Sequence, residues 1–133
     1  MSARSAVAAL AVALAGAGCA SLDATPSTLS LAAPLDDRGF ARCVEVVRLR
    51  FGVPRIDPAA RLIQSDWKDV DDAGRVARRR ASLWCEGARL CVLVEVRHLE
   101  SSTWYTHPTW TASHGHAEWE RELIAALRVE LGA

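Results

Sequence analysis

Two apolar segments joined by a glycine turn constrain the fold of this chain more than any other feature. The segments Val76–Cys85 and Leu90–His98 are rich in β-branched residues and alternate along their length, which is typical of strands with one buried face. Between them, Gly87 and Ala88 suit a two-residue type II′ turn, which favours glycine at its first position. The sequence therefore predicts an antiparallel hairpin.

The turn also sets the register of this hairpin. A two-residue loop pairs apolar residues with each other, Cys85 with Leu90 and Leu83 with Val92. We therefore expect Trp84 and Cys91 to face the other side of the sheet.

Two further segments have the apolar spacing of amphipathic helices. The first begins at Asp36 and ends at Gly52, a natural C-terminal cap. The second runs from about His116 to Leu131 and is ended by Gly132. Both patterns are one-sided, so each helix is expected to cover a sheet.

Short strands and loops are predicted between these elements. Val53–Ile56 and Arg61–Trp67 suggest a hairpin, because residues 57–60 have turn chemistry. The charged segment Lys68–Gly74 is predicted to be a loop, and residues 101–115 to be a long aromatic, polar loop.

The element order predicts an α+β fold. We expect a two-layer sandwich in which two helices pack on one face of a small antiparallel sheet, in the order helix, about four strands, helix. With 133 residues and 50% hydrophobic content, the chain suits one domain over residues 36–133. Its 16 basic and 16 acidic residues balance, which argues against a nucleic-acid partner.

The N-terminal segment is typical of a secretion signal over residues 1–18. Ala6–Ala17 is an uninterrupted apolar run of 12 residues, whereas a transmembrane helix needs about 20. The following stretch, Leu14–Cys19, resembles a bacterial lipobox, which implies lipidation of Cys19. Gly16 stands where lipoboxes prefer leucine, so two alternatives stay open. They are ordinary cleavage after Ala17, giving a soluble periplasmic protein, and an uncleaved anchor.

The residues after Cys19 fit the prediction of a lipid-anchored protein. Residues 19–35 are rich in Ser, Ala, Thr and Pro and are predicted to form a flexible tether. Ala20 is not acidic, and in the lipoprotein sorting pattern that this resembles, such a residue favours the periplasmic face of the outer membrane.

The remaining cysteines suggest a structural disulfide. Cys43 lies beside the apolar stripe of the first helix, and Cys85 lies on the core face of its strand, so this pair is preferred. Pairing of Cys85 with Cys91, pairing of Cys43 with Cys91, and free thiols are the alternatives. No local motif makes any of these cysteines a nucleophile.

The aromatic loop holds the candidate binding residues. Trp104, Tyr105 and Trp110 either cover an open part of the sheet or form a partner-binding surface. In the same region, His107, His114 and His116 are candidate ligands for zinc or copper. No catalytic motif is present, so we expect no enzyme activity and no cofactor.

The segment Ile63–Trp67, followed by an arginine-rich strand with Arg78 and Arg80, is similar to a pattern in small proteobacterial outer-membrane lipoproteins. More weakly, residues 36–131 resemble the helix-grip domains of BamC, an outer-membrane-assembly lipoprotein. This resemblance implies a non-catalytic accessory or scaffold role at the outer membrane, with another envelope protein as a partner.

Overall fold

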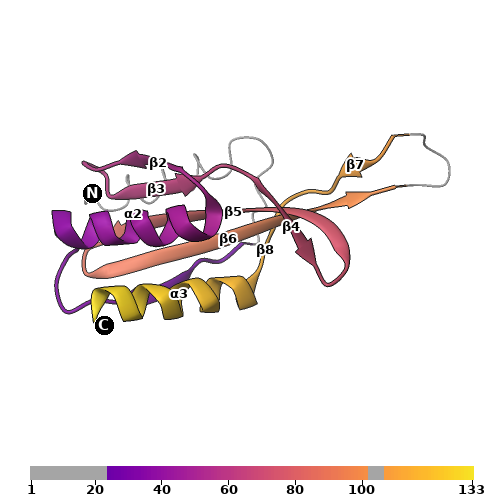
Figure 1. Cartoon of the computed structure of the whole chain (residues 1–133). Coiled ribbons are helices and arrows are strands. Elements are labelled where there is room, and N and C mark those ends of the chain that lie inside the picture. The colour runs from indigo at the N-terminus through magenta and orange to yellow at the C-terminus, as the bar shows by residue number, and fades with distance from the viewer. Residues whose placement is uncertain (1–23, 102–106) are drawn as a thin grey trace, which may run out of the picture.

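Ten helices and strands make up the part of the chain that the computed structural model describes, residues 24–101 and 107–133 (Figure 1). In chain order they are β1 (Ser27–Ser30), α2 (Asp37–Phe51), β2 (Pro54–Asp57), β3 (Leu62–Ser65), β4 (Lys68–Asp72), β5 (Arg75–Glu86), β6 (Arg89–Glu100), β7 (Thr109–Trp110), β8 (His114–Gly115) and α3 (Ala117–Leu131). The predicted signal segment, Cys19, Trp104 and Tyr105 lie outside the described residues.

The central hairpin of β5 and β6 is confirmed in its register. Cys85 pairs with Leu90 and Leu83 with Val92, as the turn requires. Gly87 has a φ of 63°, the left-handed conformation that the first position of the turn needs. Both strands extend further than expected, and with 12 residues each they are the longest strands of the described sheet.

The sheet is larger than the four strands expected. Within the described residues it has eight strands, with β1, β6, β5, β3 and β2 in spatial order, and every pair of neighbours is antiparallel. The other three strands are β4, which pairs with β5, and β7 and β8, which pair with β6. The α+β class is confirmed, and the strand count was too low.

Strand β4 corrects the prediction of a loop over Lys68–Gly74. Its residues pair with β5 from Lys68 to Asp72, and the Oδ1 atom of Asp69 lies 2.8 Å from Nε of Arg78. Opposite charges on neighbouring strands stabilise such a pair. A charged segment can therefore form a strand here, with Asp69 paired with Arg78 of the neighbouring strand, although Lys68 lies opposite Arg79.

Strand β1 corrects part of the predicted tether. Residues 27–30, which were expected to be flexible, pair with β6, and Leu29 is only 2% exposed. The hydroxyl of Ser27 also donates to Oε1 of Glu120 at 2.7 Å. The pairing of this polar segment with the edge of the sheet is thus accompanied by one buried leucine and one part-buried hydrogen bond.

Strands β7 and β8 correct part of the loop predicted over residues 101–115. Trp110 pairs with Leu99, and Gly115 pairs with Glu95. Both strands are only two residues long, too short for the alternation of a strand to be recognised in the sequence.

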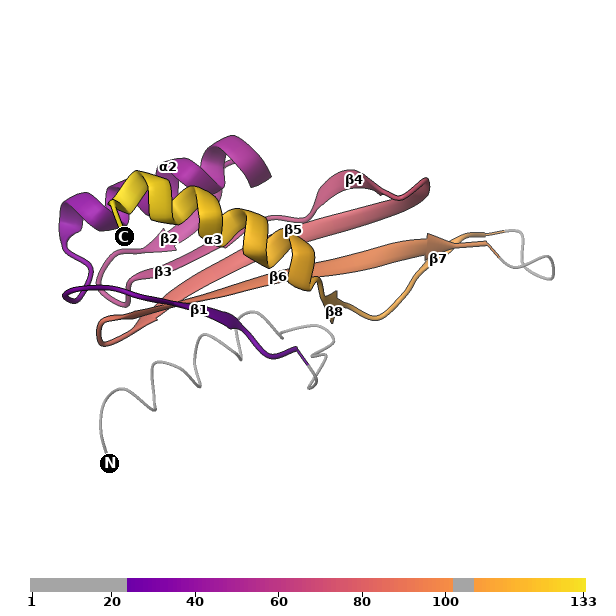
Figure 2. The same ribbon diagram turned by 90° about the horizontal axis from the view of Figure 1, so that it is seen from below.

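Both helices lie on the same side of the sheet, as expected (Figure 2). At the start of helix α2, Oδ1 of Asp36 accepts the amide hydrogen of Gly39, and His116 caps the start of α3. The core lies between the helices and the sheet, and its fully buried members include Cys43, Val47, Ile63, Leu83, Val92, Val94, Leu123 and Leu127. Neither helix in the described part of the chain is long and apolar enough to cross a bilayer.

The sheet continues beyond the helices as a single layer (Figures 1 and 2). We call this extension the arm. It consists of β4, β7, Arg75–Arg78 of β5 and Arg97–Glu100 of β6. The molecule therefore has a two-layer body and a one-layer arm.

Candidate functional site

A cluster of one aspartate and two histidines lies where the arm meets the N-terminus of α3. Nε2 of His98 lies 2.7 Å from Oδ2 of Asp72, and Nε2 of His116 lies 3.6 Å from Oδ1 of the same carboxylate. His98 is 5% exposed. The hydrogen bond with His98 is the largest effect on the pKa of Asp72 and lowers it; burial opposes this effect, and the nearby His116 adds to the lowering.

His116 also caps the helix that follows it. Its Nδ1 atom accepts the amide hydrogen of Trp119 at 3.3 Å, and the two rings stack with centroids 3.8 Å apart. An acceptor nitrogen carries no proton, so a neutral His116 directs its Nε2 proton towards Asp72. The cluster thus connects β4, β6 and the start of α3.

The predicted metal site is not formed in this arrangement. His107 is exposed, while His114 stacks on His98 with ring centroids 5.4 Å apart. In residues 24–101 and 107–133, no group of three His, Cys, Asp or Glu side chains is arranged to hold a metal ion. His116 instead contacts Asp72, which lies 44 positions earlier in the sequence.

Of the three predicted partner-binding residues, only Trp110 belongs to the described structure. It is half-buried in the arm, and the guanidinium of Arg78 lies 4.4 Å from the centroid of its ring. Arg78 also pairs with Asp69, so its position is fixed from two sides. The ring therefore lies on the face of the sheet opposite the helices, which we call the helix-free face.

A second tryptophan on the helix-free face lies between two arginines. The guanidinium groups of Arg80 and Arg97 lie 4.6 and 4.4 Å from the ring centroid of Trp67. Arg80 further pairs with Glu95, whose side chain is 4% exposed. Stacking on a cation holds the indole in one orientation.

This set of stacked residues was not predicted as a site from the sequence. Alternation along β5 is the signal that could have found it, because Arg78 and Arg80 take the face opposite Ala81 and Leu83. Trp67 lies outside the strands, so no local pattern predicts that it contacts Arg97, 30 positions later.

A small apolar cluster lies elsewhere on the helix-free face. It consists of Trp84, Cys91 and Leu93, with Ala24 and Leu62 packed against it. The prediction that Trp84 and Cys91 face away from the main core is confirmed.

The three cysteines of the described chain carry free thiols in this structure. Cys43 and Cys85 contact the main core cluster, and Cys91 belongs to the cluster on the opposite face. Burial, followed by the neighbouring Cys85, raises the pKa of Cys43 to about 12, and burial is also the main cause that raises the pKa of Cys91 to about 11. Protonated thiols are poor nucleophiles. The disulfide between Cys43 and Cys85 stays a prediction.

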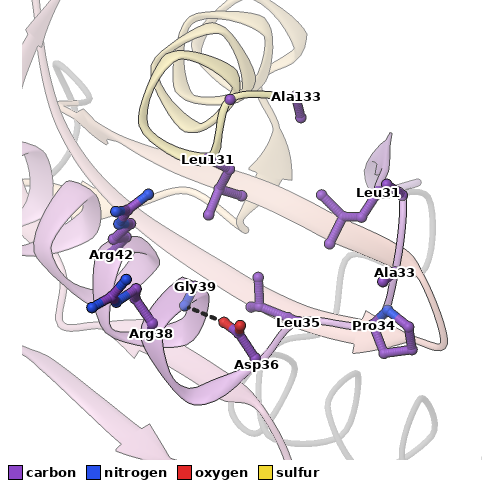
Figure 3. Close-up of a pocket in the computed structure, with 12 residues that line it drawn as sticks. Leu31, Ala33, Pro34, Leu35, Asp36, Arg38, Gly39, Arg42, Leu131 and Ala133 are labelled. Carbon is purple, nitrogen blue, oxygen red and sulfur yellow. Dashed lines mark hydrogen bonds between the residues drawn. The ribbon is translucent and has the colours of Figure 1, made fainter.

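A hollow of about 300 Å³ lies between the start of α2 and the end of α3 (Figure 3). Leu31, Leu35 and Leu131 point towards one another across it. Arg42 lies at its edge and donates to the backbone oxygen of Glu130 at 3.3 Å. The carboxylate of Asp36, which also lines the hollow, is engaged in capping α2. The hollow offers an apolar floor and no acid–base pair.

Fold and site together define a class of protein, an α+β domain with an open antiparallel sheet and a one-layer arm. No protein family model matches the chain, and no curated protein or solved structure matches it either. The similarity to BamC-type lipoproteins therefore stays a hypothesis that rests on the sequence.

Proposed function

We propose that this chain is a non-enzymatic envelope lipoprotein, anchored through Cys19, whose domain binds another envelope protein. Support for the anchor comes from the sequence, where a signal-like segment over residues 1–18 precedes the cysteine. Ala20 favours the periplasmic face of the outer membrane.

The main support for a role in partner binding is the arm and its exposed faces. A single layer of sheet leaves both of its faces uncovered by helices, and the arm presents the half-buried Trp110 stacked on Arg78. Tryptophan and arginine are the residues most often found as anchors of protein interfaces. We propose that Trp110, together with Trp104 and Tyr105, forms the partner-binding site.

The proposal of a non-enzymatic role is supported by the hydrogen bonds of two carboxylates, which link elements of the fold to each other. Glu120 accepts hydrogen bonds from Ser27 and Val94, and Asp72 accepts from His98. Each of these bonds joins one helix or strand to another, so the two carboxylates act in the packing of the fold.

Affinity capture from membranes tests the binding role. A tagged chain should retain a partner that Trp110→Ala loses, because the substitution removes the indole and leaves Arg78 without its stacking partner. Val129→Ala is the matched control, since Val129 is 85% exposed on α3 and lies away from the arm. Equal capture by Trp110→Ala and the parent would show that Trp110 does not bind the partner.

Intact-mass analysis tests the anchor. The parent should begin at Cys19 and carry the added mass of a diacylglyceryl group, and it should stay with membranes after a high-salt wash. Cys19→Ala should lose both properties. A parent protein that begins at Gly18, carries no lipid and is soluble would refute the lipoprotein proposal and favour cleavage after Ala17.

A further inference from the structure

The helix-free face carries an arginine, Arg97, whose charge no ion pair within the described residues neutralises. Arg97 lies directly opposite Arg78 in the register of the hairpin, although like charges in that position repel each other. Arg78 has Asp69 as its partner, and Arg80 has Glu95. Among the described residues, Arg97 is found in no ion pair, and its buried Nε atom has no hydrogen-bond partner.

The same face carries the aromatic residue that a bilayer surface favours. Trp67 is half-buried and stacks on Arg97. Tryptophan is enriched at the level of lipid headgroups because its ring is apolar and its N–H is polar. An arginine beside it can form two parallel hydrogen bonds to one phosphate group.

The proposed anchor is attached next to this face. Ala24 packs against Trp84, Cys91 and Leu93 on the helix-free face. Five peptide units separate Ala24 from Cys19, and a chain of that length spans at most about 18 Å. A lipid on Cys19 would therefore hold this face, rather than the helices, close to the membrane.

We infer that the helix-free face lies on the phospholipid bilayer, with Trp67 at the level of the headgroups and Arg97 bound to a lipid phosphate. This inference rests on the proposed lipidation of Cys19. The anchor supplies a high local concentration, so a small contact of one arginine and one tryptophan is enough to fix the orientation of the domain. Trp110 lies on the same face of the arm, so it would also meet the membrane surface, and the partner that it binds would be embedded in that membrane.

Fluorescence quenching in proteoliposomes tests this orientation. The full acylated chain is reconstituted into vesicles of phosphatidylethanolamine and phosphatidylglycerol, with and without a brominated phosphatidylcholine that quenches nearby tryptophan. We expect a bromine-dependent loss of emission in the parent and a smaller loss in Trp67→Phe. Trp119→Phe is the matched control, because Trp119 stacks on His116 on the helix side of the sheet. It should leave the bromine-dependent loss unchanged.

A second pair of variants tests the role of Arg97. Arg97→Gln should reduce the bromine-dependent loss, whereas Arg128→Gln, on the exposed surface of α3, should not. Circular dichroism of each variant shows that it is folded. The Trp67→Phe pair tests the orientation without changing any charge.

The outcomes separate this inference from the proposed function. An acylated protein that shows no quenching, or one in which only Trp119→Phe reduces it, overturns the orientation and leaves the lipoprotein proposal intact. An equal effect of Arg97→Gln and Arg128→Gln overturns the role of Arg97. A chain without lipid on Cys19 overturns both the proposed function and the orientation.

Discussion

Asp72 joins three parts of the molecule through one carboxylate. It belongs to β4 of the arm, its hydrogen-bond partner His98 belongs to β6, and His116 caps α3. Because the side chain of Asp72 is only 23% exposed, its contact with His98 is poorly screened by water. This residue therefore helps to fix the arm relative to the body.

The lowered pKa of Asp72 predicts how stability depends on pH. The ionised carboxylate stabilises the folded state fully at a pH above the ordinary aspartate value of 3.8, and this contribution is lost as the pH falls through the lower folded-state pKa. We therefore expect Asp72→Asn to be less stable than the parent at neutral pH, and the difference to shrink in acid. Urea unfolding at a series of pH values measures it.

Asp66→Asn is the control for this experiment, since Asp66 pairs with Arg55 in a fully hydrated position where both side chains are at least 72% exposed. It should change stability little at any pH. If Asp72→Asn and Asp66→Asn behave alike, the contact between Asp72 and His98 does not contribute to stability.

Glu120 links α3 to neighbouring strands through its carboxylate, much as Asp72 links the arm to the body. It lies in the first turn of α3 and is 3% exposed, and its two oxygens accept from the hydroxyl of Ser27 and the amide of Val94. One side chain thus ties the helix to β1 and to β6. The apolar spacing of this helix predicts which side is buried, but it gives no sign of a polar link between the helix and two strands.

We therefore expect the substitution Glu120→Ala to destabilise the folded state more than a typical substitution on a helix surface. The buried amide of Val94 would lose its acceptor, which costs about 1–3 kcal/mol, and the part-buried hydroxyl of Ser27 would lose its acceptor at a smaller cost. We expect Glu120→Ala to lower the free energy of unfolding by about 2 kcal/mol or more. Chemical denaturation measures this value.

Glu118→Ala, an exposed position in the same turn, serves as its control and should change stability by less than about 0.5 kcal/mol. Equal values for the two variants would mean that water replaces the lost acceptor.

Elements with a local signal could be predicted from the sequence. Helix α2 was recognised because Asp36 and Gly52 mark its ends, and the central hairpin because Gly87 fixes its register. Strands β1 and β4 were missed, because their pairing depends on β6 and β5, which no short pattern in their own residues reveals. The alternation that predicts a strand depends on one buried face, and β4 has no fully buried residue.

On the scale of the whole molecule, the candidate sites were harder to predict than the fold. Trp110 and His116 were singled out as residue types, but their partners Arg78 and Asp72 were not. These contacts join residues more than 30 positions apart, and only the completed sheet brings them together. The two-layer body could thus be predicted in outline, whereas the arm and its contacts could not.

The place of β1 at the edge of the sheet has a mechanical consequence. If the chain is anchored at Cys19 and a partner pulls on the arm, the load passes through β1, which begins at Ser27. Its four residues are held by their ladder to β6, and the hydroxyl of Ser27 by its hydrogen bond to Glu120. Tension on the anchor would therefore act first on this strand, and peeling it would withdraw Leu29 from the core beneath the two helices.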